Sequence, residues 1–390
     1  MFRILARKRF IRNIKHKKLL IVATRVKELD NYANLPNDEL RAKIAEIRAA
    51  AGERLTILAH YYAPDEVVEI ADYIGDSLGL AQAAAASPAE AVLFCGVRFM
   101  LETADILMNR PDKIASRGGK RAIVMAPDPS AGCPMADMIT AEQAEDWKRQ
   151  LEEHVDFSEF TPITYVNSSS ETKAFCGRHG GAVCTSANAE EVVRKAFERR
   201  PKLLFMPDSR LGMTTSLALG VMPEEIVTWR LNQPLGGATP DEIKSAKVIL
   251  WGGYCCVHQR FSEEIVRKIK ENNPGAKFWV HPEAPRNIVE LSDGYGSTTK
   301  LLDVVAKAEP GAVLAIGTEW KLVDRMRRQN PDKTILFPAE KPSVCLDMSK
   351  STLAKAAWTL ENWFEGNPIN VVRTPDDVAE DAYCALESLL

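Results

Sequence analysis

The chain has 390 residues, a length that suits two or three domains, each with a hydrophobic core of its own. Its composition, 46% hydrophobic and 26% charged, is typical of globular proteins, and its net charge of −3 argues against a nucleic-acid or acidic-polymer partner. No apolar run approaches the roughly 18 residues that a transmembrane helix needs, so that no membrane span is predicted.

Eight cysteines are spread along the chain, without the density of a secreted disulfide scaffold. We therefore expect reduced thiols and a cytoplasmic location, with some of the thiols available to a metal. No Cys-x-x-Cys pair occurs, so that any metal site must be assembled from distant segments. The cysteines are at positions 95, 133, 176, 184, 255, 256, 345 and 384.

The N-terminal segment is strongly basic. Eight of its first 20 residues are lysine or arginine, and no acidic residue precedes Glu28. The missing apolar stretch argues against a signal peptide, and we interpret residues 1–37 as a basic extension. An organellar presequence or a helix at a membrane surface is the alternative.

Residues 38–140 are predicted to form a first α/β unit. A helix is expected from Asn37 or Asp38 to about Ala50, because Leu40, Ile44 and Ile47 share one face. Strands are then predicted at 55–62, 91–96 and 122–126, with helical segments between them. Alternating strands and helices favour a parallel sheet covered by helices.

The same pattern recurs in residues 141–247 and again in residues 248–345. We therefore predict an α/β fold of three pseudo-symmetric βαβαβ units, with parallel sheets arranged around a central site. The C-terminal helices within 346–390 are expected to join the first unit. An extra strand at 248–251 follows the strands of the second unit. The other predicted strands are at 162–167, 181–186 and 203–208, and at 278–283, 312–319 and 335–339.

The first strand of each unit ends in two polar residues at i,i+2 spacing, which places both on one side of the strand. Ligands of parallel α/β sheets bind at the C-terminal ends of the strands. One such pair could be a satisfied, half-buried polar pair. Three pairs at equivalent places indicate a common site, because an unpaired buried polar group costs about 1–3 kcal/mol. The pairs are His60 with Tyr62, Tyr165 with Asn167, and His281 with Glu283.

Cys133, Cys255 and Cys345 each follow a later strand of a unit and precede a helix. Cys133 directly precedes Pro134, which is expected to begin a helix and would place the thiol at its N-terminus, where a thiolate is stabilised. Three converging thiolates suit an iron–sulfur cluster with one open iron. Zinc held by three cysteines and a histidine is the competitor, and the spacing does not choose between them.

Short turns with hydroxyl side chains follow in each unit, at Ser77, Ser186, Ser297 and Thr298. Such turns at helix N-termini bind carboxylate or phosphate through N–H groups and hydroxyls. Plain helix capping is the alternative. Neither Gly-x-Gly-x-x-Gly nor a Walker-type loop occurs, so that no nucleotide site is expected.

From about residue 38 to about residue 362, nine motifs resemble those of the quinolinate synthase family and follow in the same order. The resemblance implies three α/β domains around a [4Fe–4S] cluster held by Cys133, Cys255 and Cys345. Tandem Cys255-Cys256 leaves the second ligand ambiguous by one residue, and the following x-Val-His favours Cys255. The motifs are Ile57-Leu-Ala-His-Tyr-Tyr62, Ile70-Ala-Asp-Tyr-Ile-Gly-Asp-Ser77, Phe94-Cys-Gly-Val-Arg-Phe-Met-Leu-Glu-Thr103, Ala131-Gly-Cys133, Thr164-Tyr-Val-Asn167, Cys184-Thr-Ser-Ala-Asn188, Gly253-Tyr-Cys255, His281-Pro-Glu283 and Gly296-Ser-Thr298.

The reaction that the resemblance implies condenses iminoaspartate with dihydroxyacetone phosphate to quinolinate, with loss of phosphate and two waters. The open iron would act as a Lewis acid. A transient contact with an aspartate-oxidising enzyme is compatible with this role. Tyr62, Tyr165 and Glu283 match proton-handling residues. The residues that match carboxylate- and phosphate-binding positions are His60, Ser77, Asn167, Ser186, His281, Ser297 and Thr298.

Two alternatives stay open at this stage. One is a different three-cysteine [4Fe–4S] dehydratase or reductase. The other is a non-catalytic small-anion binding protein, which predicts a colourless protein and leaves the three cysteines unexplained.

Overall fold

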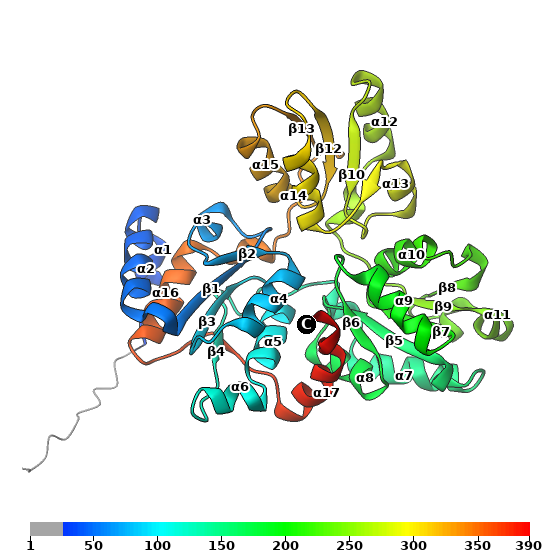
Figure 1. Ribbon diagram of the computed structural model, residues 1–390, viewed down its shortest axis with the longest axis horizontal. Helices are drawn as coiled ribbons and strands as arrows, with labels where there is room; N and C mark the ends of the chain where they lie inside the picture. Colours follow the sequence, from blue (N-terminus) through cyan, green and yellow to red (C-terminus); the bar gives the residue numbers. More distant parts are fainter. Residues whose placement is uncertain (1–25) are drawn as a thin grey trace, which may run out of the picture.

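The computed structural model describes residues 26–390, which form three α/β units around a centre (Figure 1). The prediction of an α/β fold with three repeated units and parallel sheets is confirmed. The basic extension predicted over residues 1–37 falls largely outside the described residues. No helix within residues 26–390 has the length and apolarity needed to cross a membrane.

The first unit contains a five-stranded sheet in the order β14-β4-β3-β1-β2. All neighbours pair in parallel except β14, which pairs antiparallel with β4. Its strands are β1 (Leu55–His60), β2 (Tyr73–Gly75), β3 (Ala91–Cys95), β4 (Ile123–Met125) and β14 (Val371–Val372). The helices of this part of the chain are α1 (Asp30–Ala33), α2 (Asn37–Ala51), α3 (Asp65–Val68), α4 (Ser77–Ala86), α5 (Arg98–Met108) and α6 (Pro111–Ser116).

The second unit has five parallel strands in the order β6-β5-β7-β9-β8. They are β5 (Phe160–Tyr165), β6 (Ala182–Cys184), β7 (Lys202–Met206), β8 (Ile226–Trp229) and β9 (Val248–Trp251). The expected boundary at residue 247 would assign β9 to the third unit, but β9 pairs with β7 and β8 of the second sheet. The helices are α7 (Ala141–Glu152), α8 (Ser170–Arg178), α9 (Ala189–Arg199), α10 (Ser209–Ala218) and α11 (Pro240–Ser245).

The third unit has four parallel strands in the order β11-β10-β12-β13. They are β10 (Lys277–Val280), β11 (Gly294–Tyr295), β12 (Val313–Gly317) and β13 (Thr334–Leu336). The helices are α12 (Glu263–Asn272), α13 (Arg286–Leu291), α14 (Thr298–Lys307) and α15 (Trp320–Gln329).

The three sheets share one strand order once their equivalent strands are aligned. Four strands follow one another in equivalent order from an edge strand, as β2-β1-β3-β4, β6-β5-β7-β9 and β11-β10-β12-β13. The first sheet adds β14 beyond β4, and the second adds β8 beyond β9. The sequence pattern missed the short edge strands β2 and β11, and it therefore equated β6 with β3. The structure corrects this alignment: β6 is the equivalent of β2, and β7 is the equivalent of β3.

The C-terminal segment returns to the first two units. Helix α16 (Leu353–Phe364) shares a buried apolar cluster with α2, as expected. Helix α17 (Asp376–Leu386) instead lies against α8 of the second unit, where Arg178 pairs with Asp381 at 3.1 Å. A Cβ at Gly177 would meet the Asp381 carbonyl, which shows how closely the two backbones approach.

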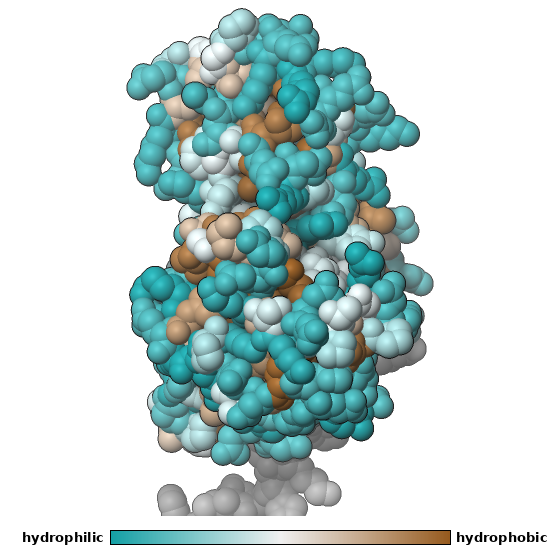
Figure 2. Space-filling model, turned by 90° about the vertical axis from the view of Figure 1, so that its right-hand side faces the viewer, coloured by the Kyte–Doolittle hydropathy of each residue, from teal (hydrophilic) through white to brown (hydrophobic). Residues whose placement is uncertain are grey.

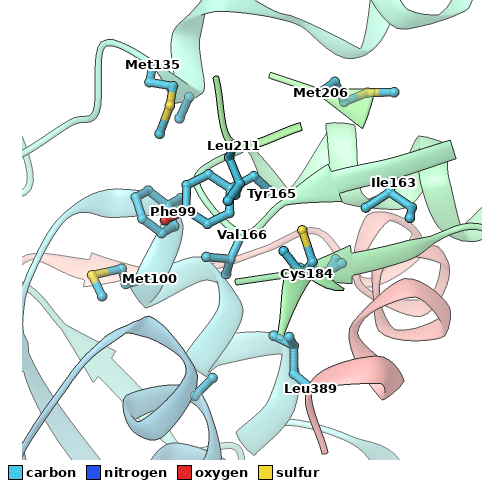
Figure 3. Close-up of a cluster of buried hydrophobic side chains, with 14 of the residues drawn as sticks. Phe99, Met100, Met135, Ile163, Tyr165, Val166, Cys184, Met206, Leu211 and Leu389 are labelled. Atoms are coloured by element: carbon cyan, nitrogen blue, oxygen red, sulfur yellow. The ribbon is translucent and has the colours of Figure 1, made fainter. Parts of the chain in front are cut away.

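The largest buried apolar cluster runs through all three units. Figure 3 shows the part of it between the first two, where Phe99 of α5 lies beside Tyr165 at the end of β5. The outer face in Figure 2 is mainly hydrophilic, its apolar patches are small, and the molecule narrows below the third unit. A continuous core thus fixes the strand ends of the units relative to one another.

Candidate active site

A cavity lies where the three units meet, at the C-terminal ends of their strands. Ligand sites of parallel α/β sheets are found at this edge. All predicted site side chains except Ser297 line the cavity. These are His60, Tyr62, Ser77, Cys133, Tyr165, Asn167, Ser186, Cys255, His281, Glu283, Thr298 and Cys345.

The three cysteines occupy equivalent positions, in the loops that follow β4, β9 and β13. A 3₁₀ helix begins three residues after each one, and its first backbone N–H donates to the cysteine Sγ. Such N–H donors stabilise a thiolate. The 3₁₀ helices are η2 (Ala136–Met138), η6 (His258–Arg260) and η7 (Met348–Lys350).

The helix expected to begin at Pro134 is not present. A turn and η2 follow Cys133, and α7 begins only at Ala141, where the Thr140 hydroxyl accepts the N–H of Gln143. The capping box formed by Thr140 and Gln143 gives α7 a better start than Pro134 could. Cys133 therefore has local N–H donors but lacks the N-terminus of a long helix.

The three thiols are partly buried in the cavity wall. Burial raises the pKa of Cys133 to about 12 and that of Cys345 to about 11, and it raises the pKa of Cys255 well above its ordinary value. A bound metal favours the thiolate in such a site. No disulfide joins any of the eight cysteines, and Cys256, the neighbour of Cys255, is exposed.

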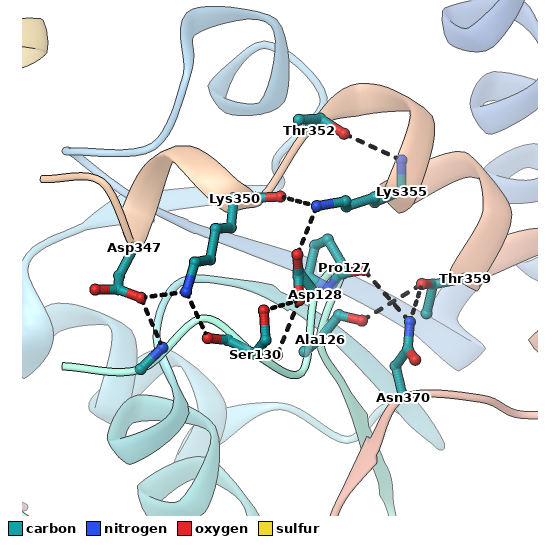
Figure 4. Close-up of polar contacts among 11 residues, drawn as sticks. Ala126, Pro127, Asp128, Ser130, Asp347, Lys350, Thr352, Lys355, Thr359 and Asn370 are labelled. Atoms are coloured by element: carbon teal, nitrogen blue, oxygen red, sulfur yellow. Dashed lines mark hydrogen bonds and ion pairs between the residues drawn. The ribbon is translucent and has the colours of Figure 1, made fainter. Parts of the chain in front are cut away.

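Polar contacts hold the Cys133 and Cys345 loops together (Figure 4). The backbone N–H of Gly132 donates to Asp347 Oδ1 at 3.2 Å. Lys350 Nζ donates to the same carboxylate at 2.7 Å and to the Ser130 carbonyl at 2.8 Å. Lys355 joins the same network through Asp128, at 2.5 Å. Two of the three thiols are thereby brought together by their own loops.

Glu283 lies at the centre of the acid–base groups. Its Oε2 is 2.8 Å from Nδ1 of His258, whose ring stacks on that of His281 with centroids 4.4 Å apart. Burial opposes ionisation of Glu283, but the two imidazoles and the Tyr165 hydroxyl lower its pKa to about 2. Glu283 is therefore an ionised carboxylate, ready to accept a proton.

The two tyrosines face this carboxylate from different units. Tyr165 hydrogen-bonds Glu283 and Ser186. Tyr62 Oη lies 2.7 Å from Thr318 Oγ1. Burial is the largest cause that raises the pKa of both tyrosines well above 10, so that both phenols carry their protons at neutral pH.

The remaining side chains suit a carboxylate or phosphate ligand. Burial lowers the pKa of His60 to about 4 and that of His281 to about 3, so that both rings are neutral. Asn167 Oδ1 and His281 Nδ1 are buried and have no hydrogen-bond partner in the described part of the chain, as expected of groups that await a ligand. Ser297 instead caps α14, where its hydroxyl accepts the N–H of Lys300 at 3.3 Å.

Neither lysine nor arginine is found among the described side chains that line the cavity. Helices α4, α9 and α14 follow the equivalent edge strands. The lining residues Ser77 and Thr298 begin α4 and α14, and the lining residue Ser186 precedes the start of α9 by three residues. Helix N-termini and hydroxyls can bind anions without a cationic side chain. An anion bound here would therefore contact backbone N–H groups and neutral side chains.

Comparisons with known proteins agree with this geometry. A family model described as quinolinate synthetase A protein matches residues 42–390. The chain belongs to this family. The quinolinate synthase of Rhodopirellula baltica is 42% identical over 364 residues, which make up 93% of this chain and 93% of that protein. The quinolinate synthase of Herpetosiphon aurantiacus is 42% identical over 364 residues, which cover 93% of this chain and 94% of that protein. The quinolinate synthase of Bacillus subtilis is 38% identical over 365 residues, which cover 93% of this chain and 95% of that protein.

In this member of the quinolinate synthase family, two side chains at the site were not predicted. His258 lines the cavity, and Thr318 lies directly behind it. His258 had a visible signal, because it follows Cys255 by only three residues and imidazole is a common metal ligand. The ligand atoms of Cys255, His258 and Glu283 all lie within 4.8 Å of one another, which is close enough to hold a metal ion.

A second buried carboxyl lies near Glu283. Asp208 accepts the N–H groups of Arg210 and Leu211 through Oδ1, whereas its Oδ2 has no partner among the described residues. Burial, followed by the charge of Glu283, raises the pKa of Asp208 well above its ordinary value. The two carboxyls therefore differ: the pKa of Glu283 is lowered, whereas that of Asp208 is raised.

Proposed function

We propose that the chain is a quinolinate synthase, which condenses iminoaspartate with dihydroxyacetone phosphate to quinolinate, phosphate and two waters. The atoms of the two substrates equal those of the products, so that no external oxidant or reductant is consumed. The observation that carries the proposal is one cavity that holds three equivalent thiols, an ionised carboxylate and two protonated tyrosines. Membership of the family supports it.

Cys133, Cys255 and Cys345 would hold a [4Fe–4S] cluster, one cysteine from each equivalent loop. Soft thiolates with N–H donors to Sγ are typical ligands of such clusters. A zinc site would need a histidine as its fourth ligand. His258 is the nearest candidate, but Glu283 occupies one ring nitrogen and Thr318 lies 3.4 Å from the other. With three protein ligands, such a cluster would keep one iron open and would supply Lewis acidity for the dehydrations.

The chain's own side chains bind the substrates and move protons. Tyr62 and Tyr165 can donate protons from their phenols, while the carboxylate of Glu283 can accept one. His60, Asn167 and His281 supply polar atoms for substrate carboxylates. Ser77, Ser186 and Thr298, at the starts of helices, suit the phosphate and the remaining carboxylate oxygens.

The side chains of Tyr62, Tyr165 and Glu283 are buried, which limits their contact with bulk water and suits a reaction that must release water and resist hydrolysis of its imine. A transient contact with an aspartate-oxidising enzyme would supply the unstable iminoaspartate, and a shift of the sedimentation coefficient in a mixture of the two proteins would reveal it.

The function is tested by anaerobic purification and assay. We expect brown protein that forms quinolinate from the two substrates, and loss of both colour and product in Cys133→Ser. A binding protein for small anions would be colourless and would form no product. A different cluster dehydratase or reductase would be brown but would also form no quinolinate; family membership argues against both alternatives.

A further inference from the structure

Two buried residues at the end of β12 have no part in the proposed reaction. Thr318 and Glu319 are both fully buried, at 0% exposure, and neither lines the cavity. A buried hydroxyl that follows a strand at the ligand-binding edge is expected to have a polar partner. The partners of Thr318 are side chains of the proposed active site.

The Thr318 hydroxyl joins groups from different parts of the chain. Tyr62, from the first unit, places its Oη 2.7 Å from Thr318 Oγ1. His258, from the loop after the second sheet, places its Nε2 3.4 Å from the same oxygen. Thr318 itself belongs to the third unit, so that its hydroxyl oxygen connects side chains from three distant segments of the chain.

The three hydrogen bonds from Tyr62 through Thr318 and His258 to Glu283 can all donate in one direction. A carboxylate at Glu283 only accepts, so that Nδ1 of His258 carries the hydrogen between them. With that hydrogen on Nδ1, Nε2 of the same ring can accept the Thr318 O–H. The Thr318 oxygen in turn accepts from the Tyr62 O–H, which turns the lone pairs of the Tyr62 oxygen away from Thr318.

Thr318 is held firmly from both sides. The carbonyl of Gly317 accepts the backbone N–H of His281 at 2.9 Å. Glu319 caps α15 and accepts the backbone N–H of Cys345 through Oε1 at 3.1 Å. The hydroxyl therefore occupies a position fixed by two residues of the same site.

The main chain on either side of Tyr62 is also fixed. The guanidinium of Arg325, on α15, donates to the carbonyls of Tyr61 and Ala63 at 2.9 Å each. With the backbone held, the 2.7 Å hydrogen bond between Tyr62 Oη and Thr318 Oγ1 restricts the phenol end of the side chain.

We propose that Thr318 is a positioning residue that sets the orientation of the Tyr62 hydroxyl and of the His258 ring for proton transfer. The inference rests on the proposed function. It predicts an effect on turnover, with little effect on the affinity for substrate, on iron content or on folding.

The test compares three variants of the full-length, cluster-loaded protein. Thr318→Val keeps the shape and removes the hydroxyl, Thr318→Ser restores the hydroxyl, and Thr161→Val is the matched control at a buried threonine of β5. We expect kcat to fall about 10- to 100-fold in Thr318→Val, the range typical when a partner of an active-site group is lost. KM, iron content and melting temperature should stay at wild-type values, and Thr318→Ser should recover most of the turnover.

Wild-type turnover in Thr318→Val would overturn the inference. So would a loss of iron or of melting temperature that accompanies the loss of activity and that serine does not correct, because Thr318 would then serve packing alone. If the wild-type protein forms no quinolinate, the proposed function fails and the inference with it. If the wild-type protein forms quinolinate and Thr318→Val keeps its turnover, the proposed function stands and only the inference about Thr318 fails.

Discussion

The backbone N–H of Gly132 donates a hydrogen bond to the carboxylate of Asp347 at 3.2 Å. Gly132 precedes Cys133, and Asp347 follows Cys345 by two residues, so that this bond connects two of the three proposed ligand loops. The loops come from the first unit and from the end of the third. The protein therefore arranges these thiols with its own polar contacts, before any metal contributes.

Replacing Asp347 should weaken the retention of iron. Asp347→Ala removes the acceptor for Gly132 and the partner of Lys350, so that the Cys133 loop is free to move. We expect iron to be retained roughly 10- to 100-fold less tightly, as measured by transfer to a chelator under anaerobic conditions. Asp332→Ala, on the exposed surface of the third unit, is the control. Equal rates of iron loss from both variants would show that the contact is unimportant.

The tandem cysteines should behave differently. Cys255→Ser removes the thiol that receives the N–H of His258 and should abolish cluster absorbance, whereas Cys256→Ser should leave the absorbance near the wild-type level. The visible spectrum of anaerobically reconstituted protein distinguishes them. A colourless Cys256→Ser together with a brown Cys255→Ser would reverse the ligand assignment.

Glu283→Gln should separate binding from chemistry. The amide keeps the size of the side chain but cannot accept a proton, and it also loses the charge next to His258. We expect kcat to fall about 100- to 10,000-fold, as is typical when a general base is removed. Substrate affinity, followed by calorimetry, and iron content should stay close to wild type. A variant that turns over at the normal rate would remove Glu283 from the proton-handling groups.

The fully buried Lys173 should make stability depend on pH. Burial lowers its pKa to about 8 from 10.5, despite the nearby Glu102 and Glu171. Between these two values the unfolded state binds more protons than the folded one, so that stability rises with pH in this window. Relative to Lys173→Met, the wild-type protein should gain about 3 kcal/mol of unfolding free energy from pH 8 to pH 10.5.

Urea unfolding of the two metal-free proteins at both pH values measures this difference. The comparison with the variant cancels the titration of tyrosines and thiols that both proteins share. A stability difference that is constant over this range would contradict a neutral Lys173 in the folded state.

Much of the architecture could be predicted from the sequence because the central strands are apolar runs bounded by polar residues. The edge strands could not be predicted in this way. β2 has only three residues, and Tyr73 and Ile74 in it are exposed, so that it carries no burial signal. Because β2 carries no such signal, the pattern aligned β6 with β3 and not with β2. The cysteines were still placed after equivalent strands.

The strand-end pairs could be predicted because they stand at the C-terminal ends of central strands, where ligands bind. The expected i,i+2 geometry within a strand is wrong, since β1 ends at His60, β5 at Tyr165 and β10 at Val280. The contact between His258 and Glu283 could not be predicted, since it joins a loop and a strand end that are 25 positions apart in the sequence. The role of Thr318 could not be predicted for a similar reason. Its partners come from other units, and their approach depends on how the units pack.

The central claim is that three thiols hold one cluster with an open iron in the substrate cavity. Mössbauer spectroscopy of protein reconstituted with ⁵⁷Fe tests it most directly. Our account predicts a [4Fe–4S] spectrum in which quinolinate changes the signal of one iron, about a quarter of the total, and leaves the other three unchanged. A protein that binds no iron, or a cluster whose four irons are all indifferent to quinolinate, would contradict it.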